Sequence, residues 1–189
     1  REAGGSVMNI VGMNLRPRDS VTGKALENAA WIGGATGVPT NAGLYLPAIA
    51  HEAGIVCTMD DVLEIMRKTP YIADLKPGGR YVAYDVHKIG GVPVVIKALL
   101  DAGLLHGDCM TVTGKTLAEN HKDVVFPIDQ DVVFPVSNAI SPTGGGVGRK
   151  EPAGTGRGGE PALLPTGEPS WCRDFAAKSS AQDAPRRAR

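Results

Sequence analysis

Apolar side chains recur at helical spacing from about residue 22 onward, separated by glycine and proline. The first regular pattern predicts a helix over 22–32, with Asp19 or Ser20 available as the capping residue. The glycine-rich stretch 33–37 that follows predicts the end of this helix and a flexible loop.

A second helix is predicted over 40–53, where apolar residues again fall on one face. Pro47 lies inside this pattern, so the helix either begins near the proline or bends there. Gly54 is well suited to the left-handed position that commonly ends a helix.

Thr58 and Asp61 have the spacing of a capping box, with a hydroxyl at the cap and a carboxylate three residues later. This predicts a helix that starts after Thr58 and closes before Pro70. The remaining predicted elements are a turn at 76–79, an apolar helix over 93–100 between Gly90–Gly91 and Gly103, and a short helix over 115–122.

The pattern changes after residue 123. Residues 124–128 and 132–136 are short, β-branched and punctuated by proline, which predicts two edge strands. From residue 148 to 189 there is no Val, Ile, Met or Tyr, and Gly, Pro, Ala and Arg dominate. Such a tail buries too little apolar area to offset the entropy of ordering, so it is expected to be largely disordered.

The composition allows a buried core, with 42% hydrophobic and 21% charged residues. The 20 basic and 20 acidic residues balance, which argues against electrostatic capture of nucleic acid or an anionic membrane. No apolar run reaches the roughly 18 residues of a membrane-spanning helix. The first residues do not form a secretory signal and lack an initial Met, so a processed chain or a fragment is expected.

Three cysteines, Cys57, Cys109 and Cys172, are widely spaced and form no Cys-x-x-Cys pair. An odd number without an export signal predicts reduced thiols in the cytoplasm. Ordinary half-buried cysteines are therefore favoured over ligands of a metal cluster.

Eight short stretches, in this order and spacing, resemble the dihydroxy-acid and sugar-acid dehydratase family, and the sixth and seventh are more similar to its dihydroxy-acid branch. The stretches are 16–19 (RPRD), 35–43 (ATGVPTNAG), 48–54 (AIAHEAG), 73–81 (ADLKPGGRY), 90–93 (GGVP), 104–109 (LLHGDC), 111–120 (TVTGKTLAEN) and 141–145 (SPTGG). The resemblance covers about residues 1–148 and implies an internal fragment of such an enzyme.

The resemblance implies an α/β fold class. Residues 1–123 would be the helix-rich end of the family's N-terminal α/β domain, and 124–147 the first strands of its C-terminal β-rich domain. Residues 148–189 would then be a disordered tail. The abrupt change of composition is what a shifted reading frame of GC-rich coding sequence would produce, a hypothesis that sequencing the nucleic acid would test.

For the full-length family the resemblance implies a cytoplasmic homodimer with an iron–sulfur cluster, Mg²⁺ and a small dihydroxy acid as substrate. It implies a hydro-lyase that forms 2-oxo acids in branched-chain amino-acid biosynthesis. The family's metal ligands and its serine base lie outside the stretch that resembles it. No catalytic, cofactor-binding or metal-binding role is therefore assigned to a residue of this chain, and neither group is expected to bind it.

One loop is a candidate substrate site: Gly37, Thr40 and Asn41 belong to a family motif that reads Gly-Gly-Ser-Thr-Asn. Here Val38 and Pro39 replace the second glycine and the serine, which removes a flexible position, an N–H and a hydroxyl. Thr40 and Asn41 could hold a substrate carboxylate at a helix N-terminus, or they could simply cap that helix.

Other candidate residues favour structural roles. The Gly-Lys-Thr at 114–116 lacks the earlier glycine of a phosphate-binding loop, because that position is Cys109. His51 and Glu52 have no partner one turn later, so a metal pair is not predicted. His87 and His106 receive the same interpretation, with Asp108 beside His106 as a weak exception.

Two alternatives to the fragment of a dihydroxy-acid dehydratase remain open at this point. One is a non-catalytic remnant that acts at most as a binding or dimerisation module, because missing segments would leave apolar helix faces exposed. The other is a fragment of a sugar-acid dehydratase. Under the first hypothesis this chain alone is expected to show no turnover.

Overall fold

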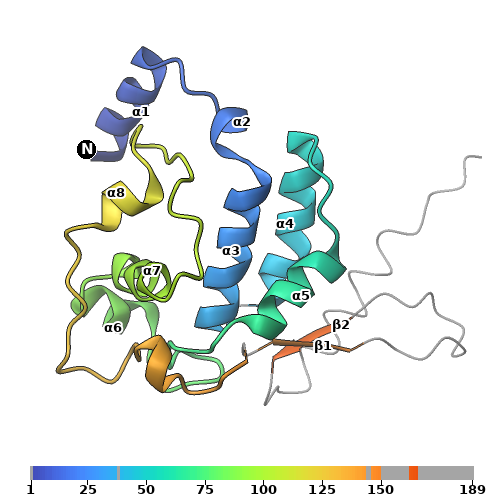
Figure 1. Cartoon of the computed structure of the whole chain (residues 1–189), viewed down its shortest axis with the longest axis vertical. Coiled ribbons are helices and arrows are strands. Elements are labelled where there is room, and N and C mark those ends of the chain that lie inside the picture. Colours follow the sequence, from blue (N-terminus) through green and yellow to red (C-terminus); the bar gives the residue numbers. More distant parts are fainter. Residues whose placement is uncertain (1, 38, 144–145, 150–161, 166–189) are drawn as a thin grey trace, which may run out of the picture.

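The computed structural model describes residues 2–37, 39–143, 146–149 and 162–165. This part of the chain is helix-rich (Figure 1). Its helices are α1 (Glu2–Gly12), α2 (Pro17–Ser20), α3 (Gly23–Thr36), α4 (Pro39–Ala53), α5 (Met59–Lys68), α6 (Ala83–Lys88), α7 (Val92–Asp101) and α8 (Leu117–His121). A single 3₁₀ turn, η1, covers Val136–Asn138, and two short strands are β1 (Gly146–Arg149) and β2 (Ala162–Pro165).

Helix α3 is the central element, with α4 and α5 packed on one side and α7 on the other (Figure 1). The predicted helix is confirmed, but both of its predicted ends are corrected. Thr22, not Asp19 or Ser20, is the cap, and its Oγ1 accepts from the Ala25 N–H at 3.2 Å. At the other end the helix continues through Thr36 and stops at Gly37, whose φ of 71° is left-handed.

The stretch 33–37 was predicted as a loop because glycine has a low intrinsic helix propensity. Packing overrides that preference here. An ideal Cβ built on Gly34 would lie only 2.9 Å from Thr69 Cβ, and Ala35 is fully buried. Small residues thus let the segment after α5 lie directly against the last turn of α3.

Helix α4 confirms the second predicted helix and includes Pro47 in its interior. The proline cannot donate to the carbonyl of Gly43, so one intrahelical hydrogen bond is missing at that point. Gly54 has a φ of 75°, as expected for the residue that ends this helix.

The predicted capping box of α5 is present. Thr58 Oγ1 accepts from the Asp61 N–H at 3.2 Å, and Asp61 Oδ2 accepts from both the Thr58 N–H and its hydroxyl at 2.7 Å. These bonds to Thr58 lower the pKa of the Asp61 carboxyl below its usual value.

We expect Thr58→Ala to lower the free energy of unfolding by about 1 kcal/mol at neutral pH, because the first turn of α5 loses its side-chain acceptor. Asp61 has a depressed folded-state pKa, so its contribution is present above the unfolded pKa and is lost as the pH falls through the folded pKa. The difference in the free energy of unfolding between wild type and Thr58→Ala should therefore become smaller below about pH 4.

Urea denaturation at several pH values measures this difference, with Thr58→Ser as the matched control that keeps the hydroxyl. A penalty of the same size for Thr58→Ser would show that the hydroxyl does not stabilise the cap.

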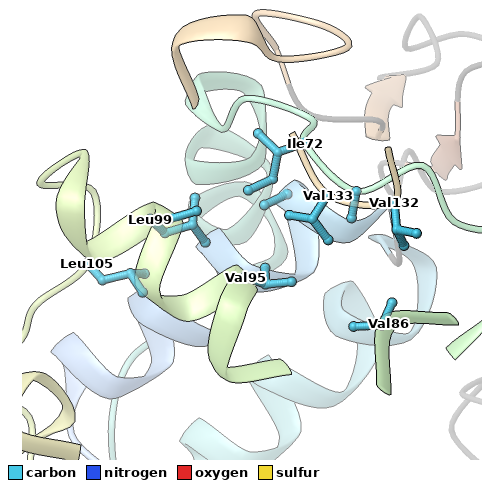
Figure 2. Packing of buried hydrophobic residues seen from close by; sticks show 10 residues of the cluster. Ile72, Val86, Val95, Leu99, Leu105, Val132 and Val133 are labelled. Carbon is cyan, nitrogen blue, oxygen red and sulfur yellow. The ribbon is translucent and has the colours of Figure 1, made fainter. Parts of the chain in front are cut away.

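Two groups of buried side chains share α3 between them. One lies between the amino-terminal half of α3, α4 and α5; its buried members are Leu26, Ala30, Leu46, Ala50, Val62, Leu63 and Met66. The other joins the end of α3 to α6, α7 and two extended segments (Figure 2). Its buried members are Ala35, Ile72, Ala73, Val86, Val95, Ala98, Leu99, Leu105, Val132 and Val133.

The strands predicted at 124–128 and 132–136 are not confirmed, since the described residues there form only a single antiparallel bridge between Val133 and Ala73. The Gln130 side chain accepts from the Val132 and Val133 N–H groups at 2.9 and 2.8 Å, so these two donors are used locally and do not extend the pairing. In the first segment Val125 and Ile128 are 82% and 90% exposed. Proline in both segments further limits pairing.

Strands β1 and β2 form an antiparallel pair in which Gly146 lies opposite Pro165 and Arg149 opposite Ala162 (Figure 1). This hairpin includes six residues of the tail that was predicted to be largely disordered, 148–149 and 162–165. The rest of that tail, 150–161 and 166–189, lies outside the described residues, so disorder there stays a prediction.

Candidate functional site

The candidate substrate loop lies where α3 ends and α4 begins. Gly37 is the left-handed C-cap of α3, and its N–H donates to the carbonyls of Gly33 and Gly34. Thr40 and Asn41 belong to the first turn of α4, and Asn41 is exposed. The three predicted residues are therefore close together. The left-handed C-cap of α3 by itself explains why position 37 is a glycine.

The first turn of a helix offers free backbone N–H groups that suit an anion such as a carboxylate. Pro39 is the first residue of α4. A proline there does not disturb the helix, because the first N–H has no intrahelical acceptor. Proline at this position also has no N–H that could be offered to an anion.

Cys57 and Cys109 are free, partly buried thiols. Burial raises the pKa of both thiols, with nearby Asp61 adding to the effect at Cys57 and Asp108 at Cys109. Cys172 lies outside the described residues. Within the described part of the chain, no three His, Cys, Asp or Glu side chains are grouped so that they could hold a metal ion.

The contacts of His106 hold the loop before α8 against α3. Its Nε2 lies 2.6 Å from Glu27 Oε2, and its backbone N–H donates to Asn28 Oδ1 at 2.8 Å. Asn28 Nδ2 in turn donates to the His106 carbonyl at 3.0 Å. An exposed pair, Lys24 Nζ and Asp108 Oδ2 at 2.6 Å, adds to this contact. The structural interpretation of His106 is supported, and Asp108 has a partner in α3.

The buried Asn28 was not singled out from the sequence. A buried polar amide needs partners, and here both its donor and its acceptor are used on one backbone unit. An asparagine on the apolar side of a helix is the signal that could have indicated it.

Thr116 is the N-cap of α8, and its Oγ1 accepts from the Glu119 N–H at 3.2 Å. The Gly-Lys-Thr stretch therefore begins a five-residue helix, as the structural interpretation expected. His51 and His87 are exposed residues in the last turns of α4 and α6.

A second polar group, also missed from the sequence, surrounds the turn at 76–79. Arg80 pairs with Asp74 and, at 3.3 Å, with Asp131, while the Tyr81 hydroxyl donates to Asp131 Oδ2 at 2.6 Å. These side chains are partners of one another in ion pairs and a hydrogen bond. The group therefore links the turn at 76–79 to the segment before Val132.

Two hollows in the described surface are lined by other residues. One of about 440 Å³ lies between Pro70, Leu104 and the segment 136–142. The other, of about 390 Å³, lies between α3 and α5 and is lined in part by Glu27, Cys57 and Asp61. Neither includes residues of 37–41.

Comparison with known proteins assigns the chain to a family. The sequence model for the N-terminal region of the dihydroxy-acid/6-phosphogluconate dehydratases matches residues 1–120. The chain belongs to this dehydratase family. The resemblance of the eight stretches is thereby confirmed.

The similar curated proteins carry the name dihydroxy-acid dehydratase, one branch of this family. The dihydroxy-acid dehydratase of Parvibaculum lavamentivorans is 64% identical over 146 residues, which are 77% of this chain and 25% of the relative. Dihydroxy-acid dehydratase 2 of Bradyrhizobium diazoefficiens is 60% identical over 148 residues, 78% of this chain and 26% of the relative. The dihydroxy-acid dehydratase of Sulfurisphaera tokodaii is 47% identical over 146 residues, 76% of this chain and 26% of the relative.

The dehydratase chain thus spans about a quarter of the length of the curated relatives that it matches. Among its described residues no helix is long and apolar enough to cross a membrane.

Proposed function

We propose that this chain is part of a dihydroxy-acid dehydratase, a hydro-lyase that converts 2,3-dihydroxy-3-methyl carboxylic acids to 2-oxo acids in the synthesis of valine, isoleucine and leucine. The observation that carries the proposal is the 64% identity over 146 residues to a relative of that name. The family also includes 6-phosphogluconate dehydratases. The dihydroxy-acid name of the relatives described above favours that branch over a sugar-acid dehydratase.

The proposed reaction removes water from two adjacent carbons. The proton on the carbon next to the carboxylate leaves, hydroxide departs from the neighbouring carbon, and the resulting enol tautomerises to the 2-oxo acid. Hydroxide is a poor leaving group, so the full-length enzyme is proposed to use an iron–sulfur cluster and Mg²⁺ to stabilise the developing charges. The described residues do not fit either group, because they form no metal-binding set. We therefore assign no metal-dependent step to them.

The role proposed for this chain is substrate binding at the segment 37–41. The exposed Asn41 and the first-turn N–H groups of α4 would donate hydrogen bonds to the substrate carboxylate. As in the family expectation, the full-length protein is proposed to be a cytoplasmic homodimer, and residues 1–123 to be part of its N-terminal α/β domain.

The exposed face of α1 favours a second candidate function. Val7, Met8 and Val11 are all more than half exposed. An apolar helix face of this kind suits a non-catalytic binding or dimerisation module. An absence of turnover by these 189 residues would be compatible with both candidates, so a test needs the further segments that the relatives have.

A chimera provides that test. The 146 residues of this chain that match the Parvibaculum lavamentivorans enzyme would replace their counterpart there, with Val38→Gly and Pro39→Ser restoring the family loop. We expect this restored chimera to dehydrate 2,3-dihydroxy-3-methylbutanoate, measured as 2-oxo acid formed. The intact relative, prepared in the same way, is the control. A folded restored chimera without activity would overturn the proposal, and activity only with sugar acids would favour the other branch.

A further inference from the structure

The segment 69–73 lies against the last turn of α3 along its whole length. An ideal Cβ on Gly34 would be 2.9 Å from Thr69 Cβ, and one on Gly37 would be 2.8 Å from Tyr71 Cε2. Between them the Ala35 carbonyl accepts from the N–H groups of Ile72 and Ala73 at 3.0 and 3.2 Å. The end of α3 therefore has little freedom to move relative to this segment.

Tyr71 is the member of the segment that contacts the candidate substrate loop. The Tyr71 ring occupies the space that a side chain at position 37 would need, since a Cβ on Gly37 would also lie 3.4 Å from its Cζ. The Tyr71 hydroxyl donates to the Leu75 carbonyl at 3.5 Å, which is a weak bond. The absence of a side chain at Gly37 is therefore what allows the ring to lie there.

The backbone of Tyr71 is bonded to the segment 140–141. Its N–H donates to the Ser141 carbonyl at 3.0 Å, and its carbonyl accepts from the Ile140 N–H at 2.9 Å. Burial raises the pKa of the Tyr71 phenol, so the ring is neutral at neutral pH. Tyr71 is thus a fixed, uncharged surface beneath Gly37.

We propose that Tyr71 is a positioning residue for the candidate substrate site, because its ring packs at Gly37, the C-cap of α3 at which the candidate loop begins. This inference rests on the proposed function for the statement that the loop binds substrate. The positioning itself can be observed without any substrate.

The first experiment measures hydrogen–deuterium exchange on all 189 residues with Tyr71→Leu. Tyr71→Phe is the matched control that keeps the ring. We expect Tyr71→Leu to speed exchange of the amides of residues 43–46 in α4 by about tenfold, because the start of that helix loses its support. Exchange in residues 95–101 of α7 should stay unchanged, and Tyr71→Phe should behave as wild type.

Unchanged exchange in α4 for Tyr71→Leu would overturn the proposal. An equal acceleration in α4 and α7 would also overturn it, because it would show a general loss of stability. If Tyr71→Phe accelerated amide exchange in α4 as much as Tyr71→Leu does, the ring would not be the group that positions Gly37.

The second experiment places the same two substitutions in the restored chimera. Tyr71→Leu should raise KM by about tenfold with kcat changed much less, whereas Tyr71→Phe should leave both near the parent values. An inactive parent chimera would overturn the proposed function and leave the exchange result standing. An active parent with unchanged KM in Tyr71→Leu would overturn the positioning role alone.

Discussion

Replacing Leu99 with alanine is expected to lower the free energy of unfolding by about 3 kcal/mol, the middle of the range for buried leucine. Leu99 is 0% exposed and lies in the group of side chains that joins α7 to the end of α3 (Figure 2). Truncation removes apolar contacts and leaves a cavity that packed neighbours close only in part.

Urea denaturation followed by far-ultraviolet circular dichroism measures the effect. Val56→Ala is the control, because Val56 is 92% exposed and its truncation should change the free energy of unfolding by less than about 0.5 kcal/mol. A loss below about 1 kcal/mol at Leu99 would show that this group of side chains is not tightly packed in solution.

Restoring the family loop in the chimera is expected to have the largest effect on activity. Compared with the chimera that keeps Val38 and Pro39, the version with Val38→Gly and Pro39→Ser should have a kcat/KM about ten- to a hundredfold higher. A hydrogen bond to a charged group contributes about 1.5–3 kcal/mol, and Pro39 lacks both the N–H and the hydroxyl that serine provides. The N–H is lost at the first position of α4, where the helix itself does not need it.

Initial rates with 2,3-dihydroxy-3-methylbutanoate provide the measurement. Pro93→Ser is the matched control, since it exchanges the same residue types in the first turn of a different helix, α7. Equal activity of the two chimeras would show that residues 38 and 39 do not contribute to substrate binding. A similar gain from Pro93→Ser would point to a general effect of removing proline.

Local signals in the sequence predicted the start of α5 correctly, whereas the predicted cap of α3 was wrong. The hydroxyl and carboxylate of Thr58 and Asp61 interact across one turn, so their spacing alone carries the information. The loop predicted at Gly33 and Gly34 was wrong because the deciding contact is not local. Their helical state depends on Thr69, a residue more than thirty positions away whose approach no local pattern records.

The same distinction holds for the candidate site. Gly37, Thr40 and Asn41 are close in sequence, and the structure keeps them close. The bonds between Asn28 and His106 join residues 78 positions apart, and the contact of Gly37 with Tyr71 depends on how α3 and the segment after α5 pack. The sequence pointed to Gly37 and His106 but not to their partners Tyr71 and Asn28, because the pairing depends on tertiary packing.

The hydrogen bonds from 132–141 to 71–74 have a consequence for synthesis on the ribosome. The Asp74 N–H donates to the Val132 carbonyl at 2.9 Å, and the Phe134 N–H donates to the Ile72 carbonyl at 2.8 Å. These hydrogen bonds of residues 72–74 can form only after some sixty further residues, up to Phe134, have been translated. During that interval the buried side chains of this segment lack part of their final packing, and transiently exposed apolar surface of this kind favours aggregation.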